Sequence, residues 1–134
     1  MTTAPSSTEH EAVVERYLRF WNAGTPEERQ RLASATFTDD VEYHAVVGVL
    51  TGPQALIDFR DQFTGHVGDA TFRRREAPQI HHGRARLMWE IEIGSGEPFA
   101  AGTDVLVFDP ENRISSVTVF LDRPPVGFDP HAHD

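Results

Sequence analysis

The sequence predicts a single α+β domain in which helices come first and an antiparallel sheet follows. Three observations predict this fold class. Apolar residues recur at helical spacing before residue 69, they alternate with polar residues beyond it, and turn clusters divide the later part into strands. The 134 residues suit one compact core rather than two. Because each helix carries one apolar stripe, the helices are expected to cover one face of the sheet.

The first helix is predicted to begin at Thr8, whose hydroxyl caps free backbone amides while Glu11 completes a capping box. Its apolar side chains recur at i, i+3, i+4 and i+7 and form one face: Val14, Tyr17, Leu18 and Trp21. The segment Asn22-Ala23-Gly24 ends this helix.

Two further helices are predicted from their N-terminal caps. Thr25-Pro26-Glu27-Glu28 combines a capping hydroxyl with a first-turn proline and an acidic third residue, and it starts a short second helix. Thr51-Gly52-Pro53-Gln54 is a similar start for a third helix, which Gly65 ends.

Five strands are predicted. One follows a turn at Asp39-Asp40 and covers residues 41–47, between the second and third helices. The other four, over residues 70–81, 84–93, 99–108 and 113–122, are joined by short connections and form an antiparallel meander. Pro78 cannot donate a hydrogen bond to a neighbouring strand, so a bulge or a sheet edge is expected there.

The two ends of the chain are predicted to be flexible tails around a domain at residues 8–122. Residues 1–7 are small and polar, and residues 123–134 contain three prolines, a glycine and two histidines. Neither a basic start followed by an apolar stretch nor a membrane-length apolar run is present, so a cytoplasmic protein is expected.

Composition excludes several kinds of chemistry. The chain has no cysteine, and all twelve basic residues are arginine, which excludes thiolate nucleophiles, Schiff-base lysines and phosphate-loop lysines. The net charge of −9 opposes binding to nucleic acid. The adjacent His81 and His82 are expected to point to opposite faces of a strand, so neither a metal site nor any cofactor is predicted.

Six segments, in order and at their spacing, resemble the nuclear transport factor 2-like superfamily, and within it the SnoaL-like polyketide cyclases and ketosteroid isomerases. They are AVVERYLRFWNAG, FTDDVEYH, TGPQALIDF, RARLMWEI, AGTDVLVFD and NRISSVTVFLD, and the resemblance covers about residues 10–122. It implies a cone-shaped, curved antiparallel sheet wrapped by three N-terminal helices, a cystatin-like α+β barrel with an apolar pocket. It also implies a homodimer. The superfamily includes many members without catalysis.

The resemblance places Tyr17 and Asp104 at the two hydrogen-bond donors that stabilise the enolate oxygen in ketosteroid isomerases. Independently, Asp104 lies in the apolar run 102–108, where an inward carboxyl group would lose its hydration and have a raised pKa. The alternative interpretations are that Asp104 points outward and pairs with Arg84 or Arg86, and that Tyr17 is a core residue.

The sequence departs from the isomerases at the general base, because that position holds Ala45 and the residue before it is His44. His44 is the candidate replacement base, since its ordinary pKa lies near neutrality. Strand alternation places His44 opposite Tyr43 and Ala45, so only one of the two sets can face the pocket. Asp122 is another possible acid or base, or a solvated strand end.

Aromatic side chains on inward-facing positions are candidates for lining a pocket that holds a flat apolar ligand. They are Trp21, Tyr43, Phe59, Phe63, Trp89 and Phe108. The alternative is that each of them simply fills the core.

Functions of different classes stay open from the sequence. The first is a small cofactor-independent acid/base enzyme, an isomerase or cyclase, acting on an apolar carbonyl-containing or polyketide-like molecule. The second is a non-catalytic homodimeric module that binds a small ligand or acts as a scaffold. A further alternative is an epoxide hydrolase of the limonene epoxide hydrolase type. That class needs two pocket carboxylates and an arginine, and the sequence offers no clear equivalent of them.

Overall fold

The computed structural model describes residues 7–129, which form three helices and seven strands. The helices are α1 (Ser7–Asn22), α2 (Pro26–Thr36) and α3 (Pro53–Val67). The strands are β1 (Phe37–Ala45), β2 (Gly48–Thr51), β3 (Ala70–Arg74), β4 (Gln79–His81), β5 (Arg84–Ile93), β6 (Glu97–Phe108) and β7 (Ile114–Arg123). Among the described residues, no helix is long and apolar enough to cross a membrane.

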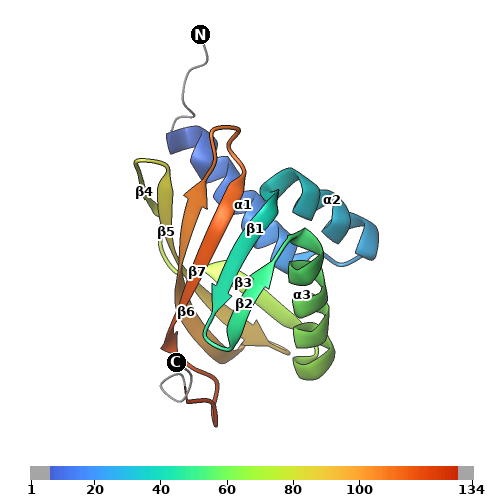
Figure 1. Cartoon of the computed structure of the whole chain (residues 1–134). Helices are drawn as coiled ribbons and strands as arrows, with labels where there is room; N and C mark the ends of the chain where they lie inside the picture. Colours follow the sequence, from blue (N-terminus) through green and yellow to red (C-terminus); the bar gives the residue numbers. More distant parts are fainter. Residues whose placement is uncertain (1–6, 130–134) are drawn as a thin grey trace.

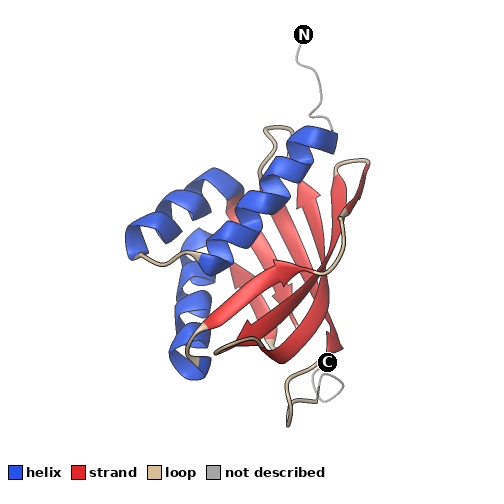
Figure 2. Cartoon of the chain, turned by 180° about the vertical axis from the view of Figure 1, so that it is seen from behind, coloured by secondary structure: helices blue, strands red, loops and turns tan. Residues whose placement is uncertain are grey.

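One curved sheet holds all seven strands, in the order β2-β1-β7-β6-β5-β3, with the short β4 also paired to β5. The helices lie together on one side of it (Figures 1 and 2). The α+β prediction with three helices is therefore confirmed. Two details differ from the predicted antiparallel barrel. The sheet does not close into a barrel, and β1 pairs with β7 in parallel. β1 enters the sheet from α2 beside the last strand of the meander, a pairing that no local signal in the sequence reveals.

Several predicted boundaries shift for physical reasons. The turn expected at Asp39-Asp40 is part of β1, and the hairpin partner β2 was not predicted. The strand expected over 70–81 is interrupted between β3 and β4, next to Pro78. α3 continues past Gly65, which has a helical conformation, and ends before Gly68 at φ 81°.

The N-terminal caps were predicted with mixed success. Thr25 caps α2 as expected, because its hydroxyl accepts a hydrogen bond from the backbone N–H of Glu28 at 3.2 Å. α3 instead begins after Gly52 and has no side-chain cap. At the chain ends, Ser7 already belongs to α1 and Arg123 to β7, while residues 1–6 and 130–134 of the predicted tails lie outside the described residues.

The core lies between the helices and the inner face of the sheet. Alternation along β5 turns Ala85, Leu87, Trp89 and Ile91 inward, where they are buried. α1 contributes the apolar face predicted from its spacing, which packs against these strands. Burying each large apolar side chain is worth about 1.5–3 kcal/mol, so this layer supplies most of the stability.

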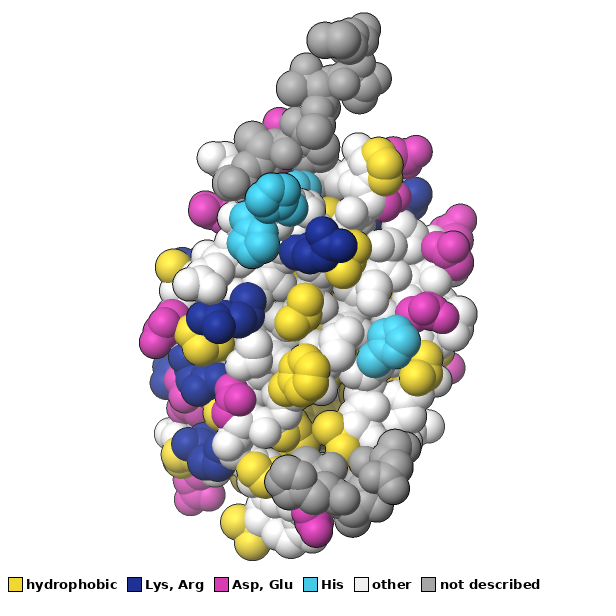
Figure 3. Space-filling model, turned by 60° about the vertical axis from the view of Figure 1, so that its left-hand side comes forward, with side chains coloured by type: hydrophobic (Ala, Val, Ile, Leu, Met, Phe, Trp, Pro, Cys, Tyr) yellow, Lys and Arg dark blue, Asp and Glu magenta, His cyan; other side chains and the backbone are white. Residues whose placement is uncertain are grey.

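The outer face of the sheet is mixed in character, with dispersed hydrophobic side chains among charged ones (Figure 3). Phe120 of β7 is the most exposed aromatic side chain in the described sheet, at 56%. Single exposed apolar residues are common on protein surfaces, so this observation leaves the predicted homodimer untested.

A buried arginine joins α1 to α3. The Arg60 side chain is 6% exposed, and its Nε donates a hydrogen bond to the carbonyl oxygen of Trp21 at 3.1 Å. Its Nη2 donates to the carbonyl of Ala23. Trp21 lies in the last turn of α1 and Ala23 directly follows the helix, where backbone carbonyls lack a partner within the helix, so Arg60 acts as a C-terminal cap supplied by another helix. Desolvation by burial lowers the pKa of Arg60 from its ordinary value.

We predict that Arg60→Met destabilises the fold by about 2 kcal/mol, because the buried carbonyl of Trp21 then loses its donor. Arg60→Lys, which keeps one donor and the charge, is expected to lose less. Urea unfolding followed by circular dichroism measures both. Equal unfolding midpoints for the wild-type protein and Arg60→Met would contradict this role.

Candidate functional site

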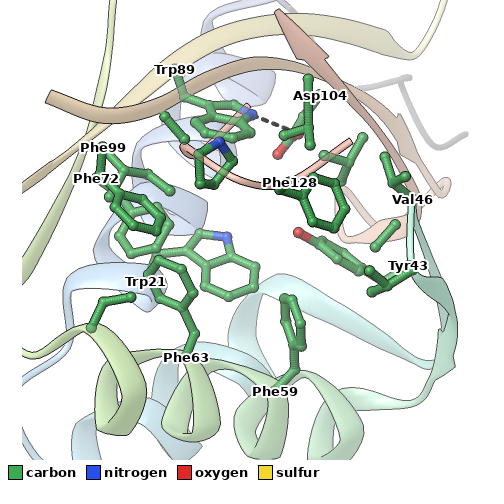
Figure 4. A pocket seen from close by; sticks show the side chains of 18 of the residues that line it. Trp21, Tyr43, Val46, Phe59, Phe63, Phe72, Trp89, Phe99, Asp104 and Phe128 are labelled. Atoms are coloured by element: carbon green, nitrogen blue, oxygen red, sulfur yellow. Dashed lines mark hydrogen bonds between the residues drawn. The ribbon is translucent and has the colours of Figure 1, made fainter. Parts of the chain in front are cut away.

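A cavity of about 480 Å³ lies between α1, α3 and the inner face of the sheet. Its lining is mainly apolar and rich in aromatic side chains (Figure 4). The aromatic residues that line it are Tyr17, Trp21, Tyr43, Phe59, Phe63, Phe72, Trp89, Phe99 and Phe128. A concave apolar space of this size with few polar groups is typical of a site for a small apolar molecule.

Asp104 is the only carboxyl group among the described residues that line this cavity. Strand alternation turns Asp104 inward together with Leu106 and Phe108, and its side chain is 3% exposed. The interpretation that Asp104 faces outward and pairs with an arginine is therefore wrong.

Two neutral donors hold the carboxyl group of Asp104. The hydroxyl of Tyr17 donates to Oδ2 at 2.6 Å, and the indole Nε1–H of Trp89 donates to Oδ1 at 2.7 Å. Both bonds are buried, and Figure 4 shows the second of them. Each carboxyl oxygen thus has a partner, although neither partner carries a positive charge.

This environment raises the pKa of Asp104 to about 7. Desolvation by burial is the largest cause, and the hydrogen bonds from Tyr17 and Trp89 oppose it by stabilising the charged form. Burial also raises the pKa of both Tyr17 and Tyr43, and the nearby charge of Asp104 adds to the effect. At neutral pH both phenols stay protonated, while the carboxyl group can exist in either state.

The position of Trp89 depends on a glycine in the neighbouring strand. Gly102 is the partner of Trp89 in the β5–β6 register, and a Cβ atom there would overlap Cζ2 of the indole. It would also lie 2.6 Å from the carbonyl oxygen of Phe120. Only glycine leaves space there for the indole, whose N–H donates to Asp104.

An arginine fixes the backbone on both sides of this contact. Arg75 donates from Nε to the carbonyl of Trp89 at 3.1 Å and from Nη2 to the carbonyl of Gly102 at 2.9 Å. Its Nη2 also lies 2.6 Å from Oδ2 of Asp122, which accepts a hydrogen bond from Thr103 as well. Asp122 therefore belongs to this support on the outer side of the sheet and does not line the cavity.

The structure brings most of the predicted site residues together. Tyr17 and Asp104 are in contact, and five of the six aromatic candidates line the cavity: Trp21, Tyr43, Phe59, Phe63 and Trp89. The sixth, Phe108, lies elsewhere in the core and stacks on His10, with ring centroids 4.2 Å apart. Phe108 faces inward as expected, but it lies at the far end of β6 from the cavity-lining Phe99 and Ala100.

The structure does not bring His44 to the cavity. Its neighbours Tyr43 and Ala45 line the cavity, whereas the His44 side chain is 41% exposed and its Nε2 lies 3.6 Å from Oε1 of Glu42. Strand alternation therefore turns Tyr43 and Ala45 toward the cavity and His44 away from it.

Four aromatic or proline residues of the lining were missed. Phe72 and Phe99 lie on β3 and β6, while Pro125 and Phe128 follow β7. The first two occupy short or terminal stretches of strand with weak alternation. The last two fall in the segment predicted to be a flexible tail, where the signal was the Pro-Val-Gly-Phe sequence of a turn.

The histidine pair differs from expectation. His82 lies in a turn with φ 51° rather than in a strand, and its Nδ1 is 3.0 Å from Nδ1 of His81. Strand alternation therefore does not separate the two rings. Within residues 7–129 no group of three or more metal-ligating side chains lies together.

Comparison with known proteins agrees with this architecture. The family model of the SnoaL-like domain matches residues 14–117, so the chain belongs to the SnoaL-like family. No curated protein matches the sequence significantly.

Solved structures match over most of the chain. A proposed isomerase of the SnoaL-like family from Agrobacterium tumefaciens has 26% identity and a TM-score of 0.80, covering 86% of this chain and 98% of its own. A proposed polyketide cyclase from Sinorhizobium meliloti has 14% identity and a TM-score of 0.67, covering 87% and 100%. A nuclear transport factor 2-like protein of unknown function from Exiguobacterium has 17% identity and a TM-score of 0.67, covering 82% and 98%. The last two likenesses show the fold alone.

We predict that Asp104→Asn changes how stability depends on pH. The raised pKa of Asp104 means that burial favours its neutral form. The stability that the neutral carboxyl group contributes to the folded state is fully present below about pH 4 and is lost as the pH rises through about 7. The stability advantage of Asp104→Asn over the wild-type protein should therefore grow by about 3 kcal/mol between about pH 5 and about pH 8. Urea unfolding of both proteins at the two pH values measures the difference in their free energies of unfolding. A difference that does not change with pH would show that burial does not raise the pKa of Asp104.

Gly102→Ala is predicted to destabilise the protein by about 1–3 kcal/mol, because the added methyl group displaces the indole of Trp89. Gly65→Ala is the matched control. A Cβ at Gly65 meets no atom within 4 Å and the site is helical, so alanine should be neutral or slightly stabilising. Thermal unfolding compares the two, and similar melting temperatures would argue against close packing at Gly102.

Proposed function

We propose that the chain is a small cofactor-independent acid/base enzyme, of the isomerase or cyclase type, that acts on an apolar carbonyl-containing molecule bound in the cavity. The observation that carries the proposal is the buried carboxyl group of Asp104 in an apolar space, with a pKa of about 7. A buried carboxyl group costs stability, and groups with such shifted pKa values are common at catalytic sites. The likeness to a proposed isomerase of the SnoaL-like family, at 26% identity, supports the same reaction class.

Asp104 would move the proton. As a carboxylate it takes a proton from the carbon next to the substrate carbonyl, and the C–H electron pair becomes the double bond of an enolate. In an isomerase, protonated Asp104 returns the proton to another carbon. In a cyclase, the enolate carbon attacks a second carbonyl of the same molecule, and the new alkoxide takes the proton from Asp104.

Tyr17 and Tyr43 would stabilise the enolate oxygen. Their raised pKa values keep both hydroxyl groups protonated, and hydrogen-bond donors in an apolar cavity are strong stabilisers of developing negative charge. In the free protein the single hydroxyl proton of Tyr17 is donated to Asp104. Once Asp104 has taken the substrate proton, its own O–H can donate to the Tyr17 oxygen, and the Tyr17 O–H then donates to the enolate oxygen. His44 is not given the role of base, because it lies outside the cavity lining.

The other candidate functions are less well supported. An epoxide hydrolase of the limonene type needs two carboxylates and an arginine, and the described lining offers only Asp104 and no arginine. A non-catalytic binding module is the outcome expected if ligands bind without turnover. The homodimer and the cytoplasmic location stay predictions.

The test uses 2-tetralone, a bicyclic ketone, and follows exchange of the protons next to its carbonyl with deuterium by proton NMR. We expect the wild-type protein to accelerate exchange above the buffer rate, with a rate that rises with pH and levels off above about pH 7, because the carboxylate is the active form. Asp104→Asn should lower the rate about a hundredfold or more, and Tyr17→Phe about tenfold.

His44→Ala is the control, and it should keep the wild-type rate. Loss of exchange in His44→Ala with retention in Asp104→Asn would reverse the assignment of the base. Binding of the ketone without any enhanced exchange in the wild-type protein would favour the binding module.

A further inference from the structure

The chain folds back after the last strand of the sheet. β7 ends at Arg123, and the backbone N–H of Phe128 donates a hydrogen bond to the carbonyl of Pro125 at 3.0 Å. Gly127, the third residue of this turn, has φ 88°. A type II turn requires a positive φ at that position, which glycine adopts without strain. The segment 125–128 is therefore a turn specified by its own residues, and we call it the C-terminal turn.

The C-terminal turn completes one wall of the cavity. Pro125 and Phe128 both line the cavity, whereas Val126 at the tip of the turn is fully exposed. Figure 4 shows the ring of Phe128 pointing into the cavity on the side of Asp104 and Tyr43. Trp21 of α1 and the phenylalanines of α3, Phe59 and Phe63, come from the helix side of the cavity.

The two walls differ in how they are held. Phe59 and Phe63 project from a helix, and Trp21 from the packed end of α1, so their positions follow from the core. Phe128 belongs to neither packed cluster of the described core, and it follows β7 in the C-terminal turn, whose conformation depends on Gly127. The C-terminal turn is the part of the lining that can set which ligand shapes are accepted without changing the core.

We propose that Phe128 is a specificity-determining residue, and that the C-terminal turn selects planar aromatic ketones. The ring of Phe128 would lie against one face of the ligand, and the aromatic residues of α1 and α3 against the other side. Offset aromatic contacts of this kind favour flat rings over flexible or puckered ones of similar size. The carbonyl would point to Asp104, and this orientation rests on the proposed function.

The experiment is isothermal titration calorimetry of the whole chain with two ketones that have the same number of carbon atoms. 2-Tetralone contains a flat aromatic ring, and cyclodecanone is flexible and aliphatic. We expect the wild-type protein to bind 2-tetralone at least about fivefold more tightly. Phe128→Leu keeps most of the apolar volume and loses the aromatic ring. It should lower the affinity for 2-tetralone about fivefold and leave that for cyclodecanone within about twofold.

Two variants of the C-terminal turn test its geometry. Gly127→Ala adds a methyl group that meets no atom within 4 Å, but alanine rarely adopts φ 88°. It should therefore lower the affinity for 2-tetralone about as much as Phe128→Leu. Val126→Ala is the matched control and should bind both ketones as the wild-type protein does, because the side chain of Val126 points into solvent.

Three results would overturn the inference: no binding of either ketone, equal affinity of the wild-type protein for both, or an unchanged affinity ratio in Phe128→Leu. The proposed function fails separately. If the affinities are as expected but no deuterium exchange is catalysed, the C-terminal turn still selects the ligand and the protein is a binding module. If exchange is catalysed and Phe128→Leu leaves the ratio of the two affinities unchanged, the proposed enzymatic function is supported and the proposed specificity role of Phe128 is wrong.

Discussion

The site depends on one electrostatic constraint, the burial of the Asp104 carboxyl group in an apolar cavity without a positive partner. Hydrogen bonds from Tyr17 and Trp89 satisfy both oxygens, but they do not offset the loss of hydration, so the pKa stays near 7. An arginine in the cavity would hold the group permanently ionised, and a solvated position would leave it an ordinary acid. The two neutral donors keep both protonation states accessible, which is what a group that accepts and returns a proton requires.

Residues that do not contact Asp104 hold its two hydrogen-bond donors in place. The indole of Trp89 reaches Asp104 because Gly102 leaves space for it, and Arg75 binds the backbone carbonyls of both residues. Arg60 similarly holds the end of α1, the helix that carries Tyr17. The catalytic group we propose is thus supported by arginines that never touch it, on the outer side of the sheet and between the helices. The two guanidinium groups therefore bind backbone carbonyls, and neither arginine lines the cavity.

The sequence was informative wherever the signal was local. Helix caps such as Thr25 and the strand at residues 84–93 were predicted from neighbouring residues, because capping and alternation depend on a few positions. Prediction failed where a distant pairing decides the outcome. β2 was missed because it pairs with β1, and Phe108 was placed in the site because alternation gives the direction of a side chain but not the depth along the strand. Phe128 was missed because its segment reads as a tail.

The sequence by itself determined the α+β class and the apolar face that holds Tyr17, since each follows from the period of a strand or a helix. It left open whether Asp104 points inward or outward, and the burial of its side chain decided this. Only the tertiary structure decided that the hydroxyl of Tyr17, 87 residues away, and the indole of Trp89 meet the two oxygens of this carboxyl group. It also decided that the side chain of His44 lies outside the cavity and that Phe128 lines it. The physical reason is that curvature and register of the sheet fix distances between strands and helices, and these arise from pairing and packing among residues far apart in the chain.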